Sequence, residues 1–220
     1  MCFSASASFV AGGILTAAGL ASIGMNRRKE RALFSAIPLL FGIQQISEGF
    51  VWLALSGDGL HMGVGPPQLA FLLFAQVLWP LWAPLSIYRM EPDVRRRKWL
   101  RLTVWIGLLV SVFLLSGLLF FFHPVAVIGN HHIRYDFESW LFTAQFTGIA
   151  YFIPTVLPPF ISGVRRCRLL GWLILTSFLV TKLFFDEFVI SVWCYFAAIM
   201  SIVVIWVIRE QSGPRYSSKQ

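Results

Sequence analysis

A glutamate and two glutamines stand close together inside an apolar stretch of the sequence. Gln44 lies one helical turn before Glu48, on the same i,i+4 face, and Gln45 stands beside it. Ionisable groups within apolar spans are costly and mark either a function or a structural pair. A carboxylate with amide neighbours can bind an ion, or can hydrogen-bond the polar part of a small molecule or lipid.

Three further polar side chains, Gln76, Gln145 and Lys182, also lie within apolar stretches. Counted from the nearer end of each stretch at 1.5 Å per residue, Glu48 lies about 12 Å deep and Gln145 about 9 Å deep. Gln76 reaches a depth similar to that of Glu48. Lys182 lies one turn from the end of its stretch and is a candidate counter-charge for Glu48. The spacing therefore predicts one polar layer.

A structural role is the alternative for this layer. Glu48 can pair with Lys182, or accept hydrogen bonds from the amides, without any ligand. Interhelical hydrogen bonds contribute only about 0.6 kcal/mol each on average in membranes, so they stabilise the packing of helices only weakly. Several amides at one depth therefore favour a cavity that binds something.

Histidine and cysteine side chains suggest a second kind of chemistry. Cys2, His61, His123, His131 and His132 fall in the N-terminal segment and in connections between apolar stretches. Imidazole, thiolate and nearby carboxylates can hold zinc or another divalent ion. Their spacing matches no known metal motif, so ordinary loop residues near lipid headgroups are the alternative.

The composition shows in which environment, water or lipid, the helices that carry these residues lie. Hydrophobic residues make up 57% and charged residues 13% of the 220-residue chain, and the mean hydropathy is +0.73. Soluble proteins average about 45–50% apolar and about 25% charged residues. A soluble fold and a disordered chain are both excluded, and the sequence predicts an integral membrane protein.

Seven stretches are long enough to cross about 30 Å of hydrocarbon as helices. They predict an all-α, polytopic bundle of seven transmembrane helices in a single domain over 1–210, followed by a short cytoplasmic tail over 211–220. An alternative merges the last two stretches into a re-entrant pair. The predicted spans are 3–25, 32–56, 68–90, 98–122, 139–163, 168–186 and 188–208.

Basic residues fix the expected orientation. Arg134 and Lys182 alone among the 18 Lys and Arg residues lie away from the connections after the first, third, fifth and seventh stretches. Because Lys and Arg stay on the cytoplasmic side, the N-terminus should be outside and the C-terminus cytoplasmic. The polar layer then lies in the outer half of the membrane, and the pocket should open outward.

Smaller features refine this expectation. Small residues dominate the stretch 3–25, so we expect it to be buried between other helices. The segment 123–138 is the longest outer connection and is apolar enough to fold over the bundle as a lid. Prolines should kink or break two of the helices: Pro80 and Pro84 in the third span, and Pro154, Pro158 and Pro159 in the fifth.

A resemblance supports testing the same residues. The opening Met1–Cys2–Phe3–Ser4–Ala5, together with Gln44–Gln45, Glu48–Gly49 and Trp52, resembles a family of uncharacterised bacterial seven-span membrane proteins. The resemblance covers about the first quarter of the chain. It implies the bacterial cytoplasmic membrane as the location, and it implies no activity.

Three functions remain open. The first is binding of a small molecule, lipid or ion around Glu48, for transport or sensing. The second is a metal- or thiol-dependent membrane enzyme, in which a divalent metal would be the cofactor. The third is a non-catalytic subunit of a larger membrane complex. Membrane lipids are expected partners; nucleic acid is not, because the chain lacks a folded basic module with interleaved aromatic residues.

Overall fold

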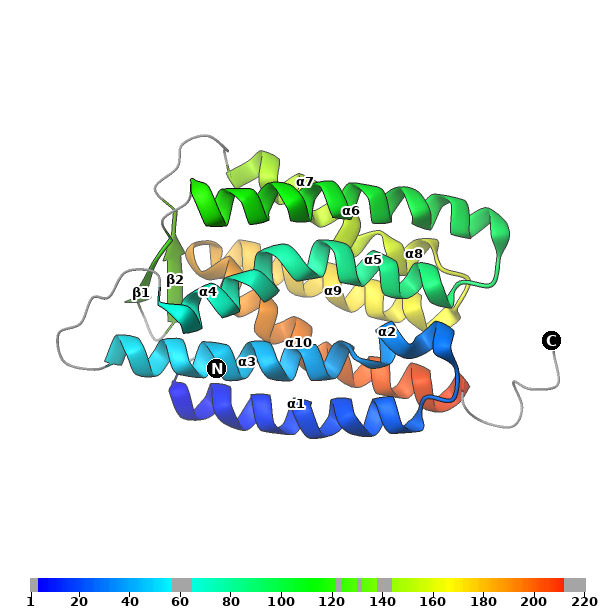
Figure 1. Cartoon of the computed structure of the whole chain (residues 1–220), viewed down its shortest axis with the longest axis horizontal. Coiled ribbons are helices and arrows are strands. Elements are labelled where there is room, and N and C mark those ends of the chain that lie inside the picture. Colours follow the sequence, from blue (N-terminus) through cyan, green and yellow to red (C-terminus); the bar gives the residue numbers. More distant parts are fainter. Residues whose placement is uncertain (1–3, 57–64, 122–123, 130–131, 138–143, 212–220) are drawn as a thin grey trace.

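The structure is a computed structural model that describes residues 4–56, 65–121, 124–129, 132–137 and 144–211. Helices run side by side along its long axis, and a two-stranded hairpin lies across one end (Figure 1). The elements are α1 Ala5–Met25, η1 Lys29–Arg31, α2 Ala32–Ser35, α3 Ile37–Ser56, α4 Pro66–Leu72, η2 Leu73–Leu78, α5 Trp79–Met90, α6 Val94–Phe120, β1 Val125–Gly129, β2 His132–Asp136, α7 Ala144–Val156, α8 Pro158–Ile161, α9 Arg165–Phe184, η3 Asp186–Phe188 and α10 Val189–Gln211.

Six helical stretches in the described part of the chain are long and apolar enough to cross a membrane. The predominantly helical build of an integral membrane protein is therefore confirmed. Each stretch lies close to a predicted span, although α6 begins four residues before the predicted 98–122. The six are Ala5–Met25, Lys29–Ser56, Pro66–Met90, Val94–Phe120, Arg165–Phe184 and Val189–Glu210.

The predicted span 139–163 differs from this pattern. Its described part consists of α7 and α8, two short helices separated at Leu157. Pro158 and Pro159 follow directly, and neither has a backbone N–H to continue the hydrogen-bond ladder of α7. The apolar run Gly148–Ile161 is shorter than the other six stretches. The predicted residues 139–143 lie outside the described residues.

The long helical stretch Pro66–Met90 is also irregular near a proline. Instead of a sharp break, a π-helical turn, η2, precedes Pro80. The carbonyls of Ala75 and Val77 accept hydrogen bonds from hydroxyls of neighbouring helices: Tyr151 Oη at 2.6 Å and Ser111 Oγ at 2.7 Å. These bonds satisfy backbone groups that lipid could not.

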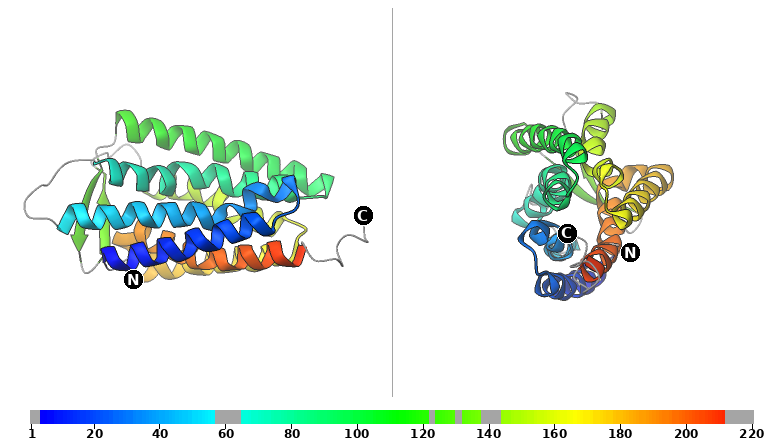
Figure 2. Two further views of the ribbon diagram at one scale, coloured as in Figure 1. Left: turned by 60° about the horizontal axis from the view of Figure 1, so that its bottom comes forward. Right: turned by 90° about the vertical axis from the view of Figure 1, so that its right-hand side faces the viewer.

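The helix α1 packs closely against α3 but is not buried between other helices, which corrects the prediction. Its buried residues form a single stripe, and its other faces are largely exposed. On that stripe, a Cβ on Gly19 would lie 2.3 Å from the backbone nitrogen of Leu39. Two separate views show α1 at the edge of the bundle beside α3 (Figure 2).

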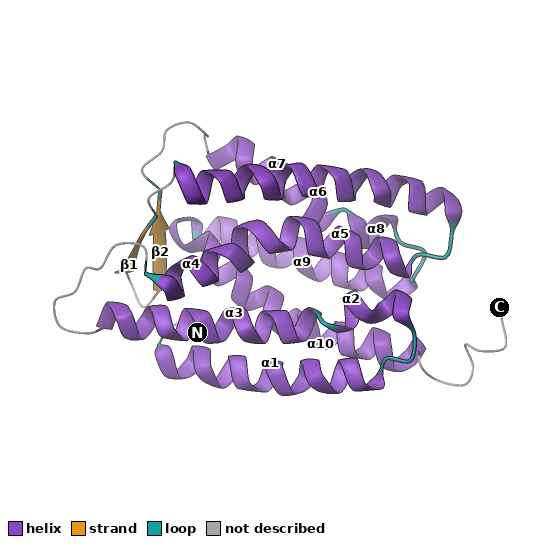
Figure 3. Ribbon diagram, viewed as in Figure 1, coloured by secondary structure: helices purple, strands orange, loops and turns teal. Residues whose placement is uncertain are grey.

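The connection 123–138, predicted as a possible lid, contains the antiparallel hairpin β1–β2. Ala126 pairs with Tyr135 in its register, and both are buried together with Ile133. The strands are the only non-helical regular elements in the described part and lie at one end of the bundle, here called the hairpin end (Figure 3). The opposite end holds the turns 26–28, 91–93 and 162–164 and is called the basic end.

Candidate functional site: a polar layer between two apolar clusters

The residues Gln44, Gln45 and Glu48 are fully buried on α3. They separate two hydrophobic clusters along the same helix. Phe41 belongs to the cluster nearer the basic end, and Val51 belongs to the cluster beneath the hairpin. The periodicity of α3 therefore turns one continuous buried stripe toward the bundle, and that stripe is polar in its middle.

Hydrogen bonds join this polar layer across three helices. Gln45 Nε2 donates to Glu48 Oε2 at 3.2 Å, and the hydroxyl of Ser191 on α10 donates to Glu48 Oε1 at 2.5 Å. The indole Nε1 of Trp79 on α5 donates to Gln44 Oε1 at 2.7 Å. Cys194 lies one turn after Ser191 on α10 and is buried as well. Uncharged side chains thus supply all of these contacts to the amide and carboxylate groups.

Several buried polar atoms at the layer have no hydrogen-bond partner among the described residues. They include Gln44 Nε2, Gln45 Oε1 and the indole nitrogens of Trp52 and Trp193. Buried polar groups are nearly always paired with protein or water, so each exception needs an explanation. The layer can therefore donate to and accept from a further molecule.

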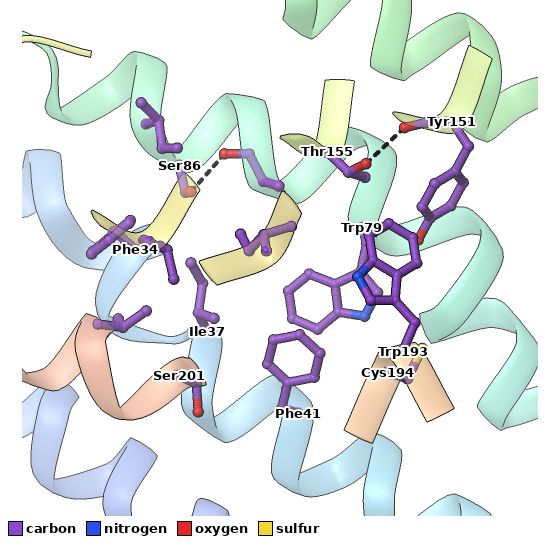
Figure 4. A pocket seen from close by; sticks show the side chains of 15 residues that line it. Phe34, Ile37, Phe41, Trp79, Ser86, Tyr151, Thr155, Trp193, Cys194 and Ser201 are labelled. Atoms are coloured by element: carbon purple, nitrogen blue, oxygen red, sulfur yellow. Dashed lines mark hydrogen bonds between the residues drawn. The ribbon is translucent and has the colours of Figure 1, made fainter. Parts of the chain in front are cut away.

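A cavity of about 80 Å³ begins at this layer and extends toward the basic end. Trp79, Trp193 and Cys194 line it near the polar layer, whereas Phe34 and Ile37 line its far part (Figure 4). Phe41 and Trp79 stack on one another with ring centroids 3.9 Å apart. Its lining is almost entirely apolar: Phe34, Ile37, Phe41, Trp79, Ala83, Ser86, Ile87, Tyr151, Thr155, Leu170, Ile174, Trp193, Cys194, Ser201 and Val204.

Not every predicted member of the layer lies in it. Lys182 is exposed on α9, which packs against α10 and α8, whereas Glu48 is buried on α3. Gln76 is half-buried in η2, and in the described part of the chain Trp79 rather than Gln76 is hydrogen-bonded to Gln44. Gln145 belongs to α7, but its side chain lies outside the described residues.

The predicted metal ligands fall mostly outside the described residues, namely Cys2, His61, His123 and His131. His132 is buried at the start of β2, with its ring centroid 5.3 Å from that of Phe185 and 5.0 Å from that of Phe188. Among the described residues, no group of three His, Cys, Asp or Glu side chains is placed to hold a metal ion.

Sequence reasoning missed two partners of the layer, Ser191 and Trp79. Ser191 lies near the end of its helix and is one of many serines, so nothing local distinguishes it. A weak signal did exist: Ser191 and Cys194 are three residues apart and therefore share a face of α10. Trp79 likewise follows the predicted site residue Gln76 by three residues, within the helical stretch Pro66–Met90.

Comparisons with known proteins add the family and nothing about activity. Neither the curated proteins nor the solved structures contain a significant match to the chain. A family match, in contrast, extends over nearly the whole chain, well beyond the first quarter in which the resemblance was seen. The chain therefore belongs to the family described as a family of unknown function (DUF6629), which it matches over residues 1–219.

Proposed function

We propose that this protein binds a membrane-soluble small molecule or lipid inside its helical bundle. The apolar part of the ligand occupies the cavity, and its polar group bonds to the layer around Glu48. The observation that carries the proposal is the buried indole N–H of Trp193, which lines the cavity and has no partner among the described residues. Gln44, whose Nε2 also has no described partner, is hydrogen-bonded to Trp79, another residue of the cavity wall.

The size and lining of the cavity define the ligand. The cavity volume is about 80 Å³. One water molecule takes up about 30 Å³ in the liquid, so the cavity has room for two or three groups of that size. Because the walls are apolar and aromatic, they favour a short alkyl or ring segment over a hydrated ion. The donors at the layer favour a carbonyl or hydroxyl oxygen on the polar group of the ligand.

For the membrane arrangement, we propose seven spans, with α7–α8 as a broken fifth span. The N-terminus is outside and the C-terminus cytoplasmic, in the cytoplasmic membrane of a bacterium. The positions of the Lys and Arg residues support this orientation. They cluster in and beside the turns after α1, α5 and α8, which lie together at one end of the bundle, opposite the hairpin (Figure 1).

We propose that a ligand enters at the hairpin end, so that the pocket opens outward when the hairpin moves. The ligand then passes the polar layer to reach the cavity, which lies on the layer's other side. Polar contacts of the hairpin and its flanking residues include one buried hydrogen bond and exposed ion pairs. Gln68 Nε2 donates to the carbonyl of Pro124 at 2.7 Å, and the exposed Arg134 pairs with Asp136 and Glu187. Exposed ion pairs contribute little to stability, so the main cost of moving the hairpin is the exposure of Ala126, Ile133 and Tyr135, which are buried against the bundle.

The test is to identify what the purified protein carries. Mass spectrometry of organic extracts from the wild-type protein should find one amphiphilic molecule in near-stoichiometric amount. Trp193→Phe keeps an aromatic ring and removes one donor, and Gln44→Leu removes the amide. Each should lower occupancy about tenfold, the effect of one lost hydrogen bond of about 1.4 kcal/mol.

Ser47→Ala is the matched control, because Ser47 lies on the same helix but bonds to the Ile43 carbonyl away from the cavity. It should carry as much ligand as the wild type. Unchanged occupancy in Trp193→Phe and Gln44→Leu, with normal folding, would contradict the proposal. So would equal losses in all three variants.

A further inference from the structure

A basic and apolar surface on α6 stands apart from the cavity. The exposed side chains of Arg95, Lys98, Trp99 and Leu102 line a shallow groove at the basic end of that helix. Their spacing of three and four residues places them on one face. We call these four residues the α6 groove.

Two neighbouring arginines lie against other parts of the protein. The Arg97 guanidinium lies 5.0 Å from the centre of the Tyr88 ring, a cation–π contact. Arg96 lies over Gly163, where its Nη1 and Glu91 Oε1 would both approach a Cβ on that glycine closely. Among the described residues, in contrast, no ion pair involves Arg95 or Lys98.

The same face of α6 continues as an apolar surface toward the hairpin end. Trp99 is 65% exposed, Trp105 59% and Leu109 70%. Leu109 follows Trp99 by ten positions, a rise of about 15 Å along the helix, which is half of the roughly 30 Å hydrocarbon core. One leaflet of the membrane therefore matches the length of the apolar part.

We infer that the α6 groove binds one anionic glycerophospholipid. The headgroup phosphate lies between the Arg95 and Lys98 side chains, and the acyl chains run along Trp99 and Leu102 toward Leu109. Charge complementarity selects the anionic headgroup, because both cations of the groove are exposed and neither takes part in an ion pair with a described residue.

Native mass spectrometry of the full chain in detergent tests this inference. Phosphatidylglycerol and phosphatidylcholine with identical acyl chains are the two probes, titrated separately. Each cation near a membrane surface changes anionic-lipid binding about fivefold, so R95Q/K98Q should weaken phosphatidylglycerol binding by up to about 30-fold. Its binding of phosphatidylcholine should stay unchanged.

The charge-matched control is R165Q/R168Q, which removes two exposed cations from the start of α9 at the same end of the bundle. It should keep the preference for phosphatidylglycerol. Equal losses in both double variants would show a diffuse charge effect and overturn the inference. No loss in R95Q/K98Q, or an equal loss of phosphatidylcholine, would overturn it as well. The single variant K98Q, with an expected fivefold effect, serves if the double variant does not fold.

Discussion

Two buried carboxylates, Glu48 in the polar layer and Glu91 at the basic end, are surrounded by different kinds of hydrogen-bond donor. Glu91 is 2% exposed at the basic end, where it accepts from the Gly163 backbone N–H at 2.8 Å and the Ser162 hydroxyl at 2.9 Å. Its other oxygen accepts from the Asp93 backbone N–H at 3.2 Å. Glu48 accepts from the side chains of Gln45 and Ser191.

The difference lies in the donors. Backbone N–H groups are fixed by the turns that contain them, so Glu91 locks the turn before α6 to the turn before α9. Side-chain amides and hydroxyls can rotate toward a new partner, and the layer around Glu48 also has unpaired amide groups. Glu91 therefore forms a structural clasp between two turns, whereas the donors from Gln45 and Ser191 at the proposed site around Glu48 can reorient.

The largest expected difference comes from the same isosteric change at both sites. Glu91→Gln leaves an amide NH₂ facing fixed donors and should lower the free energy of unfolding by about 2 kcal/mol. Glu48→Gln should cost less than about 1 kcal/mol, because the Gln45 amide can flip to present its oxygen. Unfolding in a sodium dodecyl sulfate titration measures both. Equal costs would remove the distinction between clasp and site.

A smaller difference is expected for the two serines that bond to these carboxylates. The Ser162 hydroxyl donates to Glu91 and also accepts from the Val164 N–H at 3.2 Å, so Ser162→Ala should cost about 1–2 kcal/mol. Ser191→Ala should cost about 0.6 kcal/mol and should lower ligand occupancy. The same unfolding titration checks this order. A larger cost for Ser191→Ala than for Ser162→Ala would reverse it.

The smallest effect is a pH dependence that belongs to the basic end alone. Backbone N–H groups of Arg96 and Arg95 hold the pKa of Asp93, the N-cap of α6, below its usual value of 3.8. The resulting stabilisation is complete well above pH 3.8 and disappears as the pH falls through the lowered pKa. Asp93→Asn keeps the cap but loses the charge.

Melting temperatures between pH 6 and pH 3 test this effect. The advantage of the wild type over Asp93→Asn should shrink with acidification. The same advantage should be unchanged when Glu48 is replaced by glutamine in both proteins. An advantage that is independent of pH would contradict the role of the Asp93 charge.

Hydropathy was sufficient to place six helices and to put Gln44, Gln45 and Glu48 together, because these features depend on local spacing within one helix. The rotation of each helix about its axis depends on its neighbours. The sequence therefore could not show that Lys182 is exposed on α9 or that Ser191 on α10 reaches Glu48. Such contacts between distant segments have no local periodicity to mark them.

Backbone irregularities were also beyond the sequence. The prolines predicted kinks, but not a π-helical turn whose carbonyls accept hydrogen bonds from Tyr151 and Ser111 on other helices. The hairpin β1–β2 lacks a clear alternation of apolar and polar residues, because Val125 and Val127 are exposed as well as apolar. Its burial against the bundle, rather than its own pattern, explains why it forms.

The contact between Gly19 and Leu39 has a consequence for how the protein is inserted into the membrane during synthesis. The two helices meet backbone to backbone, and the connection between them is short. They can therefore leave the insertion machinery as a preassembled pair, before the later spans are synthesised. Gly19→Ala would act at that early stage, because its methyl group would separate α1 from α3 before the later helices pack against them.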